Sequence, residues 1–93
     1  MSEFLNIDKT SGIYELIGCF DKFTIPSQWK EIKSSLKVSE PKVVDLSRVG
    51  NCDSALIALL VEIKRDYPKI EIKAAPENLI LLLDLYQVKQ LLF

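Results

Sequence analysis

The sequence predicts an α/β domain in which a mixed sheet of about four strands has helices packed on one face. Segments with the periodicity of strands alternate with segments of helical periodicity. The 93 residues contain no internal repeat, linker or low-complexity stretch that would divide them. With an apolar fraction of 48% and a charged fraction of 27%, the chain can form one packed core. We therefore treat residues 1–93 as a single domain.

The first predicted elements are a β-hairpin and a helix. Residues 4–7 and 13–20 are apolar segments separated by a turn signal at residues 9–12. Thr24 offers a capping hydroxyl close to Pro26, which suits the first turn of a helix. The helix has one amphipathic stripe, whose members are expected in the core: Ile25, Trp29, Ile32 and Leu36.

The second half of the chain is predicted to alternate strands and helices. Residues 43–46 form a short buried strand, and residues 47–52 form a polar loop. A helix over residues 54–66 ends before Pro68, and a strand follows at residues 70–74. A last helix opens at Pro76 and Glu77, and its apolar stripe consists of Leu79, Leu82, Leu83 and Tyr86.

The helix over residues 54–66 is apolar on more than one side. Its core-facing stripe is predicted to be Leu56, Leu59, Leu60 and Ile63. A second stripe, in line with Ser54, consists of Ile57, Ala58 and Val61. This second stripe either packs against another helix, with Ser54 serving only as a helix cap, or forms a protein-binding surface. Asp53 and Ser54 are both suitable N-cap residues, so the sequence leaves the two interpretations open.

The string VVDLSRVGNCDSALIALL, residues 43–60, resembles the central motif of STAS domains. In that family a strand ending in Asp-Leu-Ser, here residues 45–47, leads to Asp-Ser or Asp-Thr at a helix start, here Asp53 and Ser54. The string is most similar to that of the small cytoplasmic STAS subunits of phospholipid-transport ABC complexes in Gram-negative bacteria. Residues 16–21, the Trp29–Glu31 pair and residues 85–86 also match in position.

The resemblance implies a non-catalytic subunit that binds the ATPase of such a transporter. The implied docking residues are Asn51, Asp53, Ser54, Ile57, Ala58 and Val61. The alternative within the family is an anti-sigma-factor antagonist switched by phosphorylation of Ser54. STAS domains usually have glycine after this serine or threonine, whereas Ala55 and Leu56 follow here. We expect the bulk of Leu56 to disfavour close approach of a kinase.

Composition argues against most other functions. The chain has no histidine, and Cys19 and Cys52 lack an obvious activating partner, so we expect no enzyme activity and no metal site. Asp45 and Asp53 are the two carboxylates that could form a catalytic pair. We expect both instead to accept backbone hydrogen bonds at the ends of the strand and the helix. No phosphate-binding glycine loop is present, so no nucleotide cofactor is expected. A net charge of -1 with scattered basic residues argues against nucleic-acid binding.

The predicted location is the cytoplasm. The first residues lack the basic start and apolar stretch of a secretory signal. No window approaches the roughly 20 apolar residues of a membrane span, so we expect no direct insertion. The implied partner would place the protein at the inner membrane as a peripheral subunit.

Overall fold

The computed structural model describes residues 5–8 and 11–92. It has an α/β architecture with a four-stranded mixed sheet in the order β1-β2-β3-β4, which confirms the predicted fold class. The hairpin forms as predicted, because β1 (Leu5–Asp8) pairs antiparallel with β2 (Ile13–Phe20). Phe4, Lys9 and Thr10, which the sequence analysis assigned to this hairpin, lie outside the described residues.

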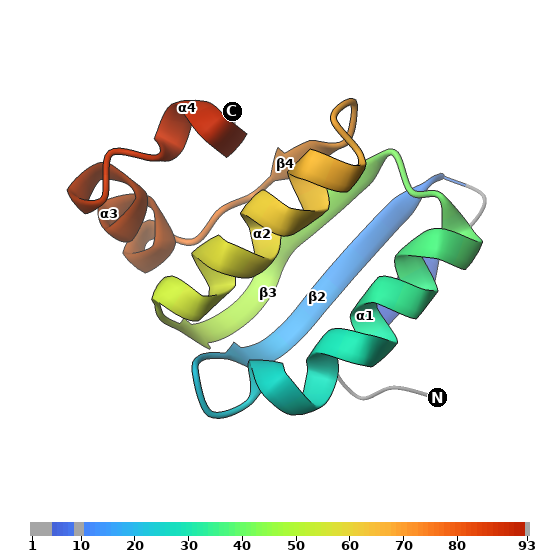
Figure 1. The fold of residues 1–93 in the computed structure, drawn as a ribbon, viewed down its shortest axis with the longest axis horizontal. Helices are drawn as coiled ribbons and strands as arrows, with labels where there is room; N and C mark the ends of the chain where they lie inside the picture. Colours follow the sequence, from blue (N-terminus) through green and yellow to red (C-terminus); the bar gives the residue numbers. More distant parts are fainter. Residues whose placement is uncertain (1–4, 9–10, 93) are drawn as a thin grey trace.

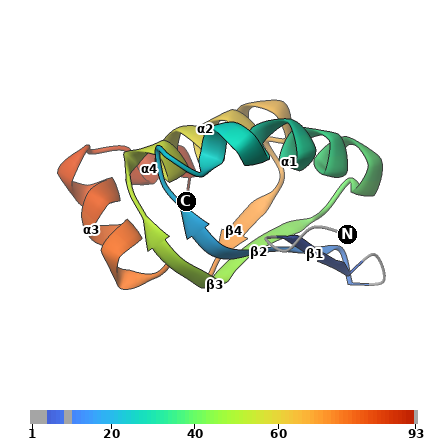
Figure 2. The same cartoon turned by 90° about the horizontal axis from the view of Figure 1, so that it is seen from below.

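Two helical crossovers build the rest of the sheet. Helix α1 (Ile25–Ser39) connects β2 to β3 (Val43–Cys52), and β3 lies parallel to β2. Helix α2 (Ser54–Asp66) connects β3 to β4 (Glu71–Lys73), again in parallel. Because such crossovers are right-handed, two successive ones that advance in the same direction place their helices on the same face. Figures 1 and 2 show α1 and α2 side by side in one layer over the sheet.

The chain ends in two further helices beside this layer. Helix α3 (Glu77–Leu85) follows β4, and the short α4 (Lys89–Leu92) comes after it. Both lie alongside α2, on the side away from α1 (Figure 1). They therefore protect the flank of α2 that α1 does not cover.

Strand β3 is longer than predicted. The sequence predicted a strand at residues 43–46 and a polar loop at residues 47–52, but β3 extends to Cys52. The prediction was wrong because most of the added residues are polar and exposed, so they show no apolar alternation. Pairing with β2 holds them extended, since Gly18 pairs with Val49 and Phe20 pairs with Cys52 across an irregular register.

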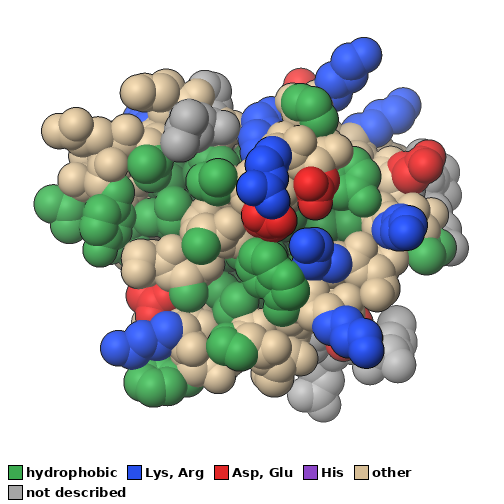
Figure 3. Space-filling model, in the orientation of Figure 1, with side chains coloured by type: hydrophobic (Ala, Val, Ile, Leu, Met, Phe, Trp, Pro, Cys, Tyr) green, Lys and Arg blue, Asp and Glu red, His purple; other side chains and the backbone are tan. Residues whose placement is uncertain are grey.

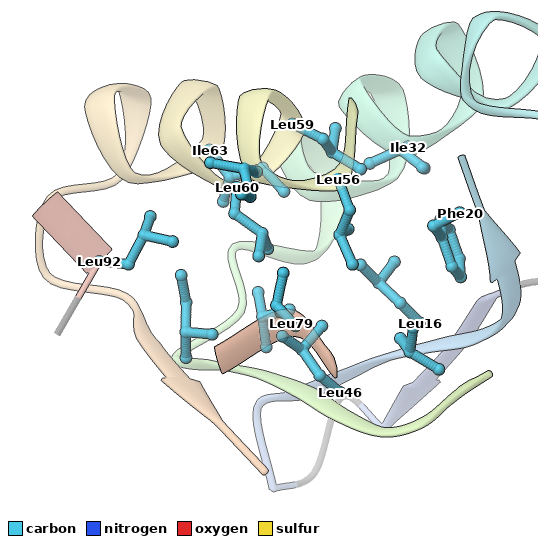
Figure 4. Close-up of a cluster of buried hydrophobic side chains, with 14 of the residues drawn as sticks. Leu16, Phe20, Ile32, Leu46, Leu56, Leu59, Leu60, Ile63, Leu79 and Leu92 are labelled. Carbon is cyan, nitrogen blue, oxygen red and sulfur yellow. The ribbon is translucent and has the colours of Figure 1, made fainter. Parts of the chain in front are cut away.

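The core lies between the helical layer and the sheet. The predicted core stripe of α2 is confirmed, because its four members are at most 2% exposed. In Figure 4 this stripe packs above apolar side chains of the strands, with Ile32 of α1 at its side and Leu79 of α3 beneath it near Leu46. The stripe consists of Leu56, Leu59, Leu60 and Ile63, and the strand residues beneath it include Leu16, Phe20 and Leu46.

The other face of the sheet carries ionic as well as apolar side chains and is covered by none of the described helices (Figure 2). One row across all four strands is Asn6, Glu15, Asp45 and Lys73, each paired in register with the next. The Asn6 amide donates to the Glu15 carboxylate at 2.6 Å. Ile13 and Val43, which pair with each other in register, lie on this same face and are half-buried, so the face mixes ionic and apolar side chains.

Tyr14 is the largest fully buried side chain, and it carries a polar hydroxyl into the core. Its ring is fully buried between β2 and α1, and its hydroxyl donates to the Ile32 carbonyl at 3.3 Å. Burial raises the pKa of Tyr14 to about 12, because the phenolate would lose its hydration.

Leu60→Ala should lower the free energy of unfolding by about 2 to 5 kcal/mol, because it leaves a cavity in the core, where Leu60 is fully buried. Chemical denaturation followed by circular dichroism measures the change. The matched control is Leu81→Ala, whose side chain is 64% exposed and whose loss should change stability by less than about 0.5 kcal/mol. Equal effects of the two changes would contradict the packing of α2 described here.

The raised pKa of Tyr14 predicts a specific loss of stability in alkali. The folded state favours the neutral phenol. The stability that buried Tyr14 contributes is therefore complete below pH 10 and is lost as pH rises towards about 12. Unfolding free energies measured across that range should fall more steeply for the wild-type protein than for Tyr14→Phe, which cannot ionise. Parallel curves for the two proteins would show that Tyr14 titrates equally in both states.

Candidate docking surface at the start of α2

The predicted docking residues begin at one end of the sheet and continue along the first two turns of α2. Strands β2 and β3 both end there, and helices α1 and α2 both begin there (Figure 1). Loops at the carboxyl ends of parallel strands are common positions for binding sites in α/β folds. The geometry of this end depends on two aspartates, Asp53 and Asp21.

Asp53 joins the two loops at this end. It is the N-cap of α2, where Oδ1 accepts a hydrogen bond from the Ala55 amide at 2.8 Å. Its second oxygen, Oδ2, accepts a hydrogen bond from the Lys22 amide at 3.0 Å. One carboxylate therefore caps α2 and attaches the loop between β2 and α1 to it.

Asp21 organises that loop from within. Its Oδ1 accepts from the amides of Phe23 at 2.9 Å and Thr24 at 3.0 Å. The Cys19 thiol donates to Oδ2, and this bond, reinforced by the two amides, lowers the pKa of Asp21 below its ordinary value. The loop is thus held with the Phe23 ring outward, 80% exposed. The Lys22 ammonium lies 5.2 Å from the ring centroid.

Thr24 does not use its hydroxyl as predicted. It occupies the N-cap position of α1, with Pro26 in the first turn, but its side chain caps no helical amide. The hydroxyl instead accepts from the Asp21 amide at 3.0 Å and donates to the Cys19 carbonyl at 3.1 Å. The threonine therefore closes the loop on itself.

Ser54 is exposed and is not the cap of α2. It is the first helical residue, after the N-cap Asp53, and its hydroxyl has no hydrogen-bond partner among the described residues. The interpretation of Ser54 as a cap is therefore wrong, because Asp53 already satisfies the first-turn amide. Ser54 places a free hydroxyl at the positive end of the helix dipole.

The second stripe of α2 divides between surface and core. Asn51 and Ala58 are exposed, and Asp53 and Val61 are half-buried. Ile57 is only 7% exposed and belongs to the core cluster, so its assignment to an outward stripe was wrong. Helical spacing puts Ile57 beside Leu60, on the flank of α2 opposite to Glu62, whose carboxylate pairs with Lys33 of α1. We define the α2 surface as Asn51, Asp53, Ser54, Ala58 and Val61.

Two aromatic side chains at the border of the α2 surface were not predicted as part of it. Phe23 projects from the loop that Asp53 attaches to α2. Trp29 is half-buried in α1, although the amphipathic stripe placed it in the core. The Lys33 ammonium, 3.6 Å from the Glu62 carboxylate, joins α1 to α2. Trp29 is one turn before Lys33 in α1, and Ala58 is one turn before Glu62 in α2. Because the two helices run in the same direction, this spacing puts Trp29 and Ala58 on facing sides of them.

A sequence signal for Phe23 does exist. Asp21 followed by Thr24 is a pattern typical of a side-chain-closed turn, which exposes the residues between them. An aromatic residue at such a turn cannot reach the core. The half-burial of Trp29 had no such signal, because it depends on the spacing between α1 and α2.

The two carboxylates and two thiols that the sequence singled out are held in hydrogen bonds or have raised pKa values. Asp45 lies on the open sheet face and accepts from the Ser47 amide at 2.7 Å, and Asp53 is the cap. The pKa of the Cys19 thiol is raised mainly by its hydrogen bond to Asp21, and that of Cys52 by burial. Residues 5–8 and 11–92 contain no group of three or more side chains suited to hold a metal ion.

Two hollows formed by the described residues lie away from the α2 surface. One, of about 240 Å³, lies between the later turns of α1 and α2 and is bordered by Lys37, Glu62 and Asp66. Another lies around Pro41 and Pro68, where β3 begins and α2 has ended. Neither hollow is bordered by a residue of the α2 surface.

Comparison with models of known protein families finds no match, and no curated protein matches the chain significantly. The resemblance to STAS domains therefore stays a prediction that rests on residues 43–60. In the part of the chain that the structure describes, no helix has the length and apolar character needed to cross a membrane.

The two residues at the start of α2 should respond differently to truncation. Asp53→Ala removes the cap and the attachment of the loop, so we expect a loss of about 0.5 to 2 kcal/mol in unfolding free energy. Ser54→Ala removes an unbonded hydroxyl and should change stability by less than about 0.5 kcal/mol. Urea denaturation measures both, and a larger loss for Ser54→Ala would contradict the capping arrangement.

Proposed function

We propose that this protein is a non-catalytic STAS subunit that binds and supports the ATPase of an inner-membrane phospholipid ABC transporter. It would be similar to MlaB, the small subunit of a complex that maintains outer-membrane lipid asymmetry. The observation that supports the proposal is the exposed start of α2, where Ser54 and Ala58 face solvent within the STAS-like motif. The partner would be an MlaF-like ATPase subunit, and the protein would be cytoplasmic and peripheral to the membrane.

The chemistry of the α2 surface favours a protein partner. Ser54 and Ala58 are small, so a partner's backbone can approach α2 closely. Phe23 and Trp29 border them with large aromatic rings, which are the side chains enriched in energetically dominant contacts. The Asp53 cap holds this end of the molecule in place, which reduces the entropy lost on binding. Such a contact needs no cofactor, metal or nucleic acid.

A second candidate is an anti-sigma-factor antagonist switched by phosphorylation of Ser54. Two structural observations support this candidate more strongly than the sequence alone does. Ser54 is exposed at a helix N-terminus, where a phosphate is electrostatically tolerated. Leu56 is fully buried, so its bulk does not obstruct a kinase, as the sequence had suggested it would.

Ser54→Arg and Ala58→Arg should each weaken binding to the ATPase by at least about tenfold while leaving the fold intact. Each change places a large charged group inside a contact that would otherwise exclude water. Binding is measured with the copurified ATPase by biolayer interferometry, and the fold by circular dichroism. Val38→Arg is the matched control, because Val38 is an exposed apolar residue in the last part of α1.

Unchanged ATPase binding by both folded α2 variants would contradict the α2 surface as the docking site. The choice between the two candidates needs a separate measurement. Purification from the native host should yield an ABC ATPase with unmodified Ser54. Phosphate on Ser54, found by mass spectrometry together with a bound kinase and no ATPase, would favour the anti-sigma-factor antagonist.

A further inference from the structure

Helix α3 exposes more apolar surface than a helix of its composition usually does. Six of its nine residues are apolar, yet only Leu79 and Leu83 are buried. Leu81 is 64% exposed and Leu85 is 72% exposed. A helix that is apolar on most sides is normally buried, so the exposed leucines of α3 indicate an interaction surface. In Figure 3 hydrophobic side chains gather over α3 at the left edge.

The ends of α3 hold it in this orientation. Ala74 before the helix has φ of 59° and Gln87 after it has φ of 57°, and both are non-glycine residues in left-handed conformation. Each such conformation costs roughly 1 kcal/mol. At its first turn, the Asn78 amide donates to the Cys52 thiol at 3.4 Å. These contacts, with buried Leu79 and Leu83, keep Leu81 and Leu85 directed to solvent.

Carboxylates flank the exposed leucines. Glu77 lies one turn before Leu81, and Asp84 directly precedes Leu85, so all four share the exposed side of the helix. Neither carboxylate forms an ion pair with a described residue. Lys89 is the one basic residue in residues 74–92. We name Glu77, Leu81, Asp84 and Leu85 the α3 stripe.

We propose that the α3 stripe is a docking site for a basic amphipathic helix of a partner protein. The apolar side of that helix would cover Leu81 and Leu85, and its lysine or arginine side chains would pair with Glu77 and Asp84. The negative charges of Glu77 and Asp84 favour a partner whose side chains are basic. A second copy would bring carboxylates against carboxylates, and an anionic lipid surface would repel them. None of these residues belongs to the α2 surface, so this proposal does not depend on the proposed function.

The probe is a synthetic leucine–lysine amphipathic peptide of about 18 residues, long enough to be helical when bound. A matched peptide has glutamate in place of every lysine. Titrations are followed by ¹H–¹⁵N NMR of the full-length protein. The lysine peptide should shift amide signals of α3, and the glutamate peptide should bind at least tenfold more weakly.

Two double variants separate the apolar and ionic contributions. Leu81→Ser with Leu85→Ser should weaken binding of the lysine peptide at least tenfold. Glu77→Gln with Asp84→Asn should weaken it several-fold and reduce its dependence on salt. The control is Val38→Ser, another exposed apolar position, which should leave binding unchanged. Because all five positions are exposed, circular dichroism should show the fold retained in each variant.

Several results would overturn the proposal. They are failure of the lysine peptide to bind, equal binding of the glutamate peptide, and shifts confined to the α2 surface. Sedimentation showing a dimer that Leu81→Ser with Leu85→Ser dissociates would assign the stripe to a second copy. Cosedimentation with phosphatidylglycerol vesicles, lost in the same variant, would assign it to a membrane.

Discussion

The apolar layer between the sheet and helices α1 and α2 is the constraint on which the rest of the structure depends. A domain this small has room for one core, and both crossover helices lie on the same face. The core stripe of α2 must therefore meet the strands directly, and Leu60 is fully buried as a result. The opposite sheet face is covered by none of the described helices, and there Glu15 and Asp45 lie beside half-buried Ile13 and Val43.

The same constraint explains why the exposed apolar residues gather where they do. Phe23 is held outward by the loop that Asp53 and Asp21 fix, and Leu81 and Leu85 project from α3 at the flank of the core. None of the three contributes to the layer between sheet and helices. The α2 surface combines small residues with aromatic neighbours, whereas the α3 stripe combines leucines with carboxylates. The two surfaces are therefore suited to partners of different chemistry.

Local patterns account for the parts of the fold that were predicted correctly. The hairpin, the helix over residues 54–66 and its core stripe all follow from the periodicity of apolar residues, because burial on one side imposes that period. The hydrogen-bonding roles expected for Asp45 and Asp53 are confirmed as well. Each of these two bonds comes from an amide two residues later, whereas the bond from the Lys22 amide to Asp53 joins segments distant in the chain.

By itself the sequence determined the fold class, the order of most elements and the core side of α2. Only the tertiary structure decided which neighbours cover each helix. Pairing with β2 extends β3 to Cys52, the flanking helices bury Ile57, and the spacing of α1 and α2 leaves Trp29 half-exposed. The exposure of Leu81 and Leu85 was decided in the same way. A one-dimensional pattern records which residues are apolar, whereas burial depends on contacts between segments distant in the chain.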